Sequence, residues 1–453
     1  MHTEHDALGA VSVPDDVDWG AQTERSRHHF PVGPRMPLAV VRGLITIKLA
    51  AAQAAPAAPK RDAIVAAAQA LLESPDAELA QHFPLHVYQT GSGTQTNMNV
   101  NEVIAHRASQ LAGVAVHPND DVNAGQSSND DFPTAMNLAA YPAVSALITA
   151  VTRLTATLAQ KAADYAQVVK LGRTHLQDAT PLTLGQEISG WQATLAGDAA
   201  TLTSLQSQLL ALPLGGTAVG TGLNTTPART ATIIANIAAI TGTPYVEMPN
   251  KFHGLTAHSE LTTVHGAVRT LATDLIKIAN DLRFLASGPR GGYGELTIPA
   301  NEPGSSIMPG KVNPTQAEAL TMIGARVIGN DATIGFANSQ GNFELNVYKP
   351  IIISAFLDSC TLLASGITQF TQLLVAGFTA NVDHMQAVVA NSLMLVTALA
   401  PHIGYEKAAQ LAQQAQASGA SLKETALASG WVSAADFAKW VDPLAMTNPQ
   451  ALQ

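Results

Sequence analysis

Apolar residues recur at steps of three and four over long stretches of the chain. After SSNDDFP they occupy positions 143, 147, 150, 154, 158, 162 and 165, which is the pattern of one long helix. Similar long patterns follow Pro181, Thr230, Thr256 and Pro314. The stretch 350–370 is apolar almost all round, as in a buried helix. These patterns predict a mainly α chain built on a long central helical bundle.

The patterns also divide the chain into three predicted domains. Residues 1–125 carry shorter elements broken by proline-rich turns, which predicts a mixed, mostly helical N-terminal domain. Residues 126–382 are predicted to form the long-helix bundle. Residues 383–453 are predicted to form several short helices in a small C-terminal domain. No fixed repeat period is present, which disfavours an α-solenoid.

The composition adds a prediction about assembly. Charged residues make up 13% of the 453 residues, against about 25% in typical soluble domains. Long, alanine-rich helices with so little charge suggest that their outer faces are buried against other copies of the chain. The bundle is therefore expected to be the core of an oligomer.

Charge and cysteine content exclude several classes of function. The net charge of −10 makes nucleic acid and anionic membranes poor partners. One cysteine, Cys360, excludes an intrachain disulfide framework and fits a reducing, cytoplasmic setting. The early charges of the N-terminus are not those of a secretory signal, and no long uncharged apolar run predicts a membrane span.

Four polar segments interrupt the helical patterns, at 91–102, 117–130, 172–187 and 304–318. Each precedes a helical pattern. Thr180–Pro181 and Asn313–Pro314 are predicted helix starts, and Gln316 has the spacing of a capping box. Helix starts offer unpaired N–H groups, so several of them could bind a small carboxylate. Capping alone remains a sufficient explanation for any one segment.

The segment GSSIMPGKVN, 304–313, is similar at first sight to a phosphate-binding loop. Five residues separate Gly304 from Gly310, and Val312 stands where a metal-binding hydroxyl is required, so we reject that reading. The alternative is a mobile loop that delivers Ser305 and Ser306 ahead of a helix, beside Lys311. A serine in that setting could act as a base or nucleophile. A flexible surface linker is the competing interpretation.

His175 is the best candidate for a general acid or base, because histidine titrates near neutral pH. The competing interpretation is an exposed loop histidine. Glu318, early in the helix after Lys311, could orient it. An acid in a first helical turn is also explained by the helix dipole.

Together these segments resemble the aspartase/fumarase superfamily, and most closely the class II fumarate hydratases. The resemblance runs nearly from end to end, and the superfamily signature GSSxMPxKxN appears here as GSSIMPGKVN. Further matching segments are GSGTQTNMNVNE, HPNDDVN with QSSND, GRTHLQDATPLTLGQE, GGTAVGTGLNT, FELNVYKP and PHIGYEKAA.

The resemblance implies a homotetramer of three-domain subunits, with active sites shared between subunits and no metal or organic cofactor. By motif position, Ser305 is the catalytic base, and His175, paired with Glu318, is the other acid/base residue. The positions that match substrate binding are Ser92, Gly93, Thr94, Ser127, Ser128, Asn129, Thr174, Ser306, Lys311, Val312 and Asn313. Those that match a second carboxylate site are His117, Pro118, Asn119 and Asp120.

Two features separate the possible reactions within the superfamily. Aspartases tend to carry glutamine at the position of His175, and their segment differs from GGTAVGTGLNT at 215–225. Both features favour reversible hydration of fumarate to L-malate. The alternatives are an aspartate ammonia-lyase and a non-catalytic protein on the same scaffold.

Overall fold

The structure is a computed structural model, and it describes residues 1–448 of the chain. The chain divides into two compact units. The first unit comprises Met1–Thr149, Ala200–Ala272 and Ile323–Ala364. The second comprises Ala150–Ala199, Thr273–Met322 and the chain from Ser365. The three predicted domains follow a different division, and their boundaries stay predictions.

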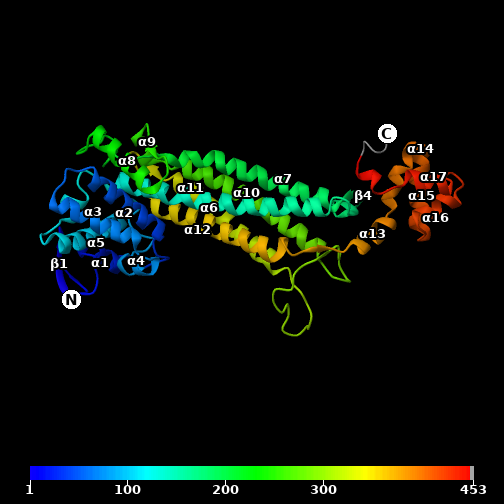
Figure 1. Ribbon diagram of the computed structural model, residues 1–453, viewed down its shortest axis with the longest axis horizontal. Helices are drawn as coiled ribbons and strands as arrows, with labels where there is room; N and C mark the ends of the chain where they lie inside the picture. Colours follow the sequence, from blue (N-terminus) through cyan, green and yellow to red (C-terminus); the bar gives the residue numbers. More distant parts are fainter. Residues whose placement is uncertain (449–453) are drawn as a thin grey trace. The chain divides into compact units, whose positions relative to one another are not determined.

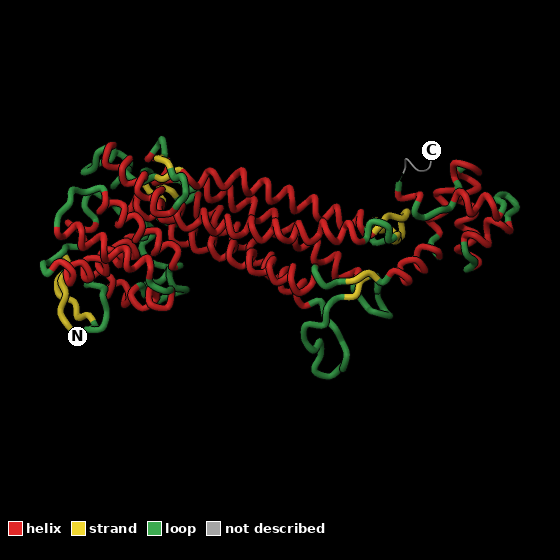
Figure 2. The backbone as a smooth tube through the Cα atoms, viewed as in Figure 1, coloured by secondary structure: helices red, strands yellow, loops and turns green. Residues whose placement is uncertain are grey.

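Five long helices form the bundle predicted from the apolar spacing (Figure 1). They are α6 (Ser128–Asp164), α7 (Leu184–Gln206), α10 (Ser259–Leu285), α11 (Thr315–Asn338) and α12 (Lys349–Phe370). Each has one part in the first unit and the other part in the second. The mainly α fold class is confirmed, and the strands of residues 1–448 are short and lie in pairs (Figure 2).

Within the first unit, polar bonds fix how these helices pack. His265 on α10 is fully buried, and its two ring nitrogens lie 2.8 Å from Asp331 on α11 and 2.9 Å from Ser359 on α12. Gln206 on α7 donates to the carbonyl oxygen of Tyr141 on α6, at 2.9 Å. Buried polar side chains must be paired, so these bonds specify one arrangement of an otherwise apolar bundle.

The rest of the first unit consists of shorter elements. A hairpin of β1 (His2–Asp6) and β2 (Gly9–Val13) is antiparallel, and β5 (Ala211–Leu212) pairs in parallel with β6 (Val246–Glu247). The other short elements are α1 (Ala21–His29), α2 (Leu38–Gln53), α3 (Pro59–Glu73), α4 (Asp76–His82), α5 (Thr94–Ala112), η1 (Pro118–Val122), η2 (Ser207–Leu210), α8 (Pro227–Thr241), α9 (Lys251–Thr256), β8 (Gly341–Asn342) and β9 (Leu345–Asn346).

The second unit holds a hairpin and a group of short helices. The antiparallel hairpin is β3 (Val169–Thr174) with β4 (Gln177–Thr183), and β7 (Leu296–Thr297) pairs with β10 (Thr379–Ala380). Leu171 of β3 packs in one buried cluster with residues of the following helices, such as Leu395 and Leu411. The short helices of this unit are, in chain order, η3 (Thr371–Val375), α13 (Val382–Ala390), η4 (Leu393–Ala398), α14 (Ala400–Ile403), α15 (Tyr405–Ser418), α16 (Leu422–Ala428), α17 (Ala434–Trp440) and η5 (Ala445–Thr447).

Within residues 1–448, two helical stretches have the length and mean hydropathy of a membrane-crossing helix. They are Ser128–Asp164 and Lys349–Val375. In the most apolar window of each, 61% and 50% respectively is buried inside the chain. Core helices of a bundle have the same composition, and this burial fits that role. The expectation of no membrane partner stays a prediction.

Candidate active site

The start of α5 carries the first group of predicted site residues. Gly93 precedes the helix with φ +78, and a Cβ at this position would lie 2.2 Å from the ring of Phe132. Only glycine tolerates both conditions. Ser92 Oγ and Thr94 Oγ1 lie 2.8 Å apart on either side of it. The glycine therefore brings two hydroxyl groups together at a helix N-terminus, where N–H groups lack intrahelical partners.

The start of α6 lies next to the start of α5. Asn97 on α5 donates to Ser128 Oγ at 3.0 Å. The Asn129 amide donates to the carbonyl oxygen of Ala218 at 2.8 Å, and the Asn129 N–H donates to Ser127 Oγ at 3.2 Å. The structure thus brings two of the predicted polar segments, 91–102 and 117–130, together within the first unit.

Buried charges lie directly behind these hydroxyls. Lys48 is completely buried, and its Nζ donates to Asp131 at 2.5 Å and to Asn123 at 2.7 Å. Asp130 accepts from the N–H of Gly215 at 2.8 Å. Burial, and then the neighbouring Asp131, raise the pKa of Asp130 to about 7. These groups fix the loop before α6 and the first turn of that helix.

Sequence reasoning missed this buried support. A signal for Lys48 did exist, because it is the lone charge in the apolar run LITIKLAAA of α2. A weaker signal is Lys349, the lysine of the segment FELNVYKP. It too is fully buried, and burial lowers its pKa to about 7. Which acid a buried lysine meets depends on the tertiary fold and cannot be read from local spacing.

The HPND segment forms one short turn of π-helix, η1, on the first unit. His117 Nδ1 accepts from the N–H of Asp120 at 3.1 Å, so the histidine caps the turn. Asp121 accepts from the His117 N–H at 2.8 Å and pairs with Lys60 at 2.8 Å. The His117 and Asp120 side chains are 54% and 83% exposed. The segment is therefore preformed and open, and its role as a second carboxylate site stays a prediction.

His175 lies at the tip of the β3–β4 hairpin in the second unit. It forms a two-residue turn with Leu176 between the paired residues Thr174 and Gln177. The φ angles of His175 and Leu176 are 57° and 61°, in the left-handed region. The predicted residues Thr174 and His175 are both exposed. The hairpin therefore holds the imidazole out from the chain.

The predicted helix start at Thr180–Pro181 is wrong. Both residues belong to β4, because the residue before a proline favours extended backbone and β3 supplies a pairing partner. Helix α7 begins at Leu184. Its cap is Thr183, whose Oγ1 accepts from the Gln186 N–H at 3.0 Å while Gln186 Oε1 accepts from the Thr183 N–H at 2.9 Å.

The loop before α11 carries Ser305, as the glycine and proline pattern predicted. Ser305 Oγ accepts from the backbone N–H groups of Ile307 and Met308, at 3.2 and 3.0 Å. The Gly304 N–H donates to the carbonyl oxygen of Lys311 at 3.0 Å and closes the loop on itself. A Cβ at Gly304 would lie 2.1 Å from that oxygen. Ser306, Lys311 and Val312 are exposed.

The residues that follow the loop differ in part from the prediction. The Asn313 amide donates to the Gly304 carbonyl, which fastens both ends of the 304–313 loop. The predicted capping box is wrong, because Gln316 Oε1 accepts from Asn301 at 3.0 Å instead. Glu318 lies half-buried in the first turn of α11. No hydrogen bond or ion pair within residues 1–448 of one chain joins Glu318 to His175.

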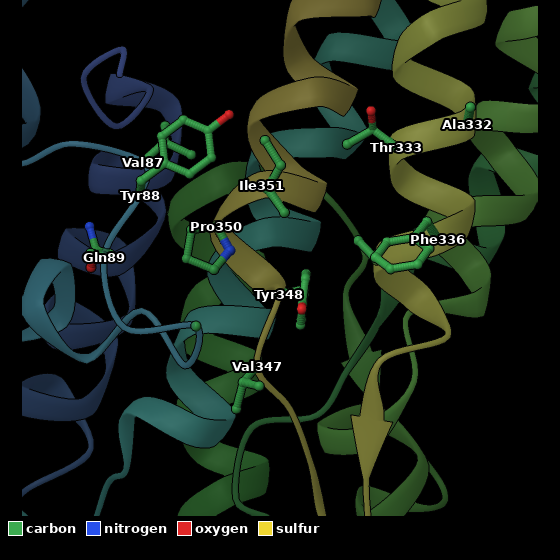
Figure 3. Close-up of a pocket in the computed structure, with 12 residues that line it drawn as sticks. Val87, Tyr88, Gln89, Ala332, Thr333, Phe336, Val347, Tyr348, Pro350 and Ile351 are labelled. Atoms are coloured by element: carbon green, nitrogen blue, oxygen red, sulfur yellow. The ribbon is translucent and has the colours of Figure 1, made fainter. Parts of the chain in front are cut away.

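Two further features bear on possible ligands. Within residues 1–448, no group of three or more histidine, cysteine or acidic side chains has the arrangement to hold a metal ion. An apolar pocket of about 570 Å³ opens on the first unit, between the segment before α5, α11 and the start of α12 (Figure 3). It contains none of the predicted site residues. Its lining residues are Val87, Tyr88, Gln89, Gly91, Ala332, Thr333, Phe336, Ala337, Val347, Tyr348, Pro350 and Ile351.

Comparisons with known proteins agree with this organisation. A family model described as lyase matches residues 9–329, and one described as fumarase C C-terminus matches residues 395–448. These matches therefore relate the chain to lyases. The chain carries the long helices, the polar helix starts and the serine-bearing loop before α11 described above.

Proteins that match the chain over its full length identify the class of lyase. The class II fumarate hydratase of Listeria monocytogenes serotype 4b (strain F2365) is 53% identical over 450 residues, covering 98% of this chain and 99% of the relative. That of Halalkalibacterium halodurans is 54% identical over 459 residues, 99% of each. The crystal structure of recombinant class II fumarase from Schistosoma mansoni matches with a TM-score of 0.94, at 39% identity over 99% of each chain. The chain belongs to the class II fumarate hydratases of this lyase family.

Proposed function

We propose that the protein catalyses the reversible hydration of fumarate to L-malate. The observation that carries this proposal is the 304–313 loop. It combines a serine oxygen that accepts two backbone N–H groups with an exposed lysine, directly ahead of a helix start. A carbon acid next to a carboxylate needs a base and, close by, donors for the charge that develops. The family membership supports the same reaction.

In the malate direction, Ser305 acts as its alkoxide, which removes the proton from the carbon next to a carboxylate and becomes a neutral hydroxyl. The electron pair moves into that carboxylate and gives an aci-carboxylate dianion. Lys311, Asn313 and the N–H groups of helix starts stabilise this charge. The hydroxyl on the neighbouring carbon then leaves as water, with the proton supplied by His175, which Glu318 orients. Closure of the loop carrying Ser305 over the substrate excludes bulk water.

The two helix starts of the first unit supply the substrate-binding hydroxyl and amide groups. Ser92 and Thr94 lie at one, and Ser127, Ser128 and Asn129 at the other. The Asn97–Ser128 bond keeps the two starts together. Short hydroxyl and amide side chains at the N-termini of helices recognise a carboxylate without adding net charge. A small dicarboxylate is therefore the substrate class, and no cofactor takes part.

The active site is shared between the subunits of a homotetramer. Three observations support this part of the proposal. Thr174 and His175 are exposed at the tip of a hairpin, and Glu318 has no bond to His175 within the described part of its own chain. Exposed apolar side chains also lie on the bundle, including Phe336, which is 62% exposed. Association would cover these faces and bring partner residues to the hairpin tip.

The 117–120 segment is proposed as a second carboxylate site. His117 and Asp120 are exposed there, and the turn is already ordered by the bond between them. The protein is proposed to act in the cytoplasm, since its one cysteine, Cys360, is buried and free.

Product analysis tests the proposed reaction. Purified protein is supplied with fumarate, with and without ammonium and with and without a chelator, and products are identified by proton NMR. Malate is expected in every condition, at a rate that the chelator does not change. Aspartate formed only with ammonium would establish the ammonia-lyase instead. If the folded protein forms neither malate nor aspartate, both reactions are contradicted.

A further inference from the structure

The turn that presents His175 is conformationally costly. Two-residue hairpin turns with positive φ at both positions strongly prefer Asn-Gly. Here the two positions hold His175 and Leu176, with φ of 57° and 61°. Residues other than glycine hold such angles only where the surrounding structure enforces them. Both side chains are exposed, so within the chain the restraint must come from the stem of the hairpin.

The stem carries a buried ionic cluster that the proposed reaction does not use. Lys170 and Arg173 of β3 both reach the carboxylate of Glu295, at 3.1 and 2.6 Å. Lys170 also lies 3.0 Å from Glu187 in the first turn of α7. The side chains of Lys170 and Glu295 are each only 1% exposed. Two cations and two anions balance, as burial requires.

Glu295 is held rigidly by its own backbone. Its N–H donates to the carbonyl oxygen of Leu285, at the end of α10, at 2.8 Å. Its carbonyl oxygen accepts from the N–H of Asn381, just before α13, also at 2.8 Å. The carboxylate therefore extends from a fixed point toward β3, and it binds two cations of the same strand.

Arg173 connects this fixed point to the turn. It lies two residues before His175, and its guanidinium is held by Glu295 and by the ring of Tyr293, 4.4 Å from the ring centroid. The pairing register of the hairpin shifts between Leu171 and Arg173. At Gly172, between them, a Cβ would lie 2.5 Å from the carbonyl oxygen of Thr180. The strands are thus closely fitted at the cluster, just before the turn.

We propose that Arg173 and Glu295 are positioning residues, which hold the hairpin so that its strained turn presents the His175 imidazole to the substrate. The inference rests on the role of His175 in the proposed function. A displacement of about 1 Å at a reacting group costs roughly 10²-fold in rate. If the cluster served only the stability of the fold, its loss would change the amount of folded enzyme. It would not change the contribution of His175 to kcat.

A double-mutant cycle on kcat for malate dehydration tests this inference. The substitution Arg173→Met is made in the wild-type chain and in His175→Asn. We expect it to lower kcat by roughly 10²-fold in the wild-type chain. In His175→Asn we expect a further loss of less than about threefold, because the group being positioned is already absent. Arg173→Lys, which keeps the charge toward Glu295, should retain more activity than Arg173→Met.

The matched control is Arg42→Met in the first unit. Arg42 is also partly buried and makes three bonds, to the carbonyl oxygens of Leu72 and Ser74 and to Asp76, at 2.7, 2.8 and 2.7 Å. It should leave kcat within about twofold, since it does not act through His175. If the Arg173→Met enzyme does not assemble, the same double-mutant cycle is measured with Glu295→Gln, which keeps the shape of the side chain.

Equal losses from Arg173→Met in both backgrounds would overturn the inference and leave the proposed function intact. So would wild-type kcat in the folded Arg173→Met enzyme. Wild-type turnover by His175→Asn itself would instead overturn the role of His175, and the inference with it. Absence of any turnover of malate or fumarate by the wild-type protein would be a failure of the proposed function.

Discussion

At the scale of single residues, the proposed site depends on hydrogen-bond donors placed where negative charge develops. Ser305 Oγ accepts two N–H bonds from the backbone, so negative charge on this oxygen is already met by donors before substrate arrives. The same loop leaves Lys311 exposed. An acidic protein can in this way bind a dianion through local dipoles and one cation, against its own net charge.

A residue-scale prediction concerns His258, which is buried and remains neutral. Burial, and then the charge of Lys349, lower its pKa from 6.5 to about 3. The unfolded chain takes up a proton below about pH 6.5 and the folded chain does not, so stability is complete above that pH and falls as the pH drops. Acidification from pH 7.5 to 5 should cost about 2 kcal/mol through this group.

The measurement is the melting temperature at both pH values for the wild type and for His258→Leu. The leucine variant cannot take up this proton, so its melting temperature should fall less on acidification than that of the wild type. Equal falls in the two proteins would show that His258 does not contribute to acid lability.

At the scale of elements, apolar periodicity predicted the long helices, and the glycine and proline pattern predicted the loop before α11, but neither predicted the hairpin. Helix α6 was expected from its apolar spacing, and it spans Ser128–Asp164. The strands β3 and β4 are short, and their pairing depends on each other and on contacts distant in sequence. Glu295 lies 122 positions from Arg173, so no local pattern connects the two. Local signals predict helices well, whereas buried ionic partners require the tertiary fold.

An element-scale prediction concerns Lys48, which fastens the start of α6 to α2. Replacing it by methionine leaves Asp131 buried without its cation, which should cost about 3–5 kcal/mol of stability. The measurement is the melting temperature of the assembled enzyme. The double variant Lys48→Met with Asp131→Leu removes both charges and should recover part of the loss. A single variant as stable as the wild type would contradict the proposed anchoring.

At the scale of the whole molecule, the exposed apolar faces of the bundle indicate association between copies of the chain. Phe336, 62% exposed, and Tyr348, 37% exposed, line the pocket in Figure 3, and Ile328 on α11 is 41% exposed. Exposed groups of this kind mark interaction surfaces. Low overall charge in the sequence led to the same expectation.

The corresponding prediction is that Phe336→Asp lowers the oligomeric state and abolishes hydration together, because we propose that the active sites are shared between subunits. A charge buried at such an interface lacks a partner and opposes assembly. Light scattering after gel filtration gives the mass, with Leu8→Asp as the control, since Leu8 is 81% exposed in the turn between β1 and β2. A fully active Phe336→Asp monomer would contradict shared sites.

The proposed role of Ser305 as the base in fumarate hydration is tested by the turnover of L-malate by Ser305→Ala. The ultraviolet absorbance of the fumarate double bond is followed for the wild type and for the variant, each confirmed as the same folded oligomer. We expect rapid formation of fumarate by the wild type and a loss of at least roughly 10²-fold in kcat in the variant. Near-normal turnover by Ser305→Ala would contradict this role.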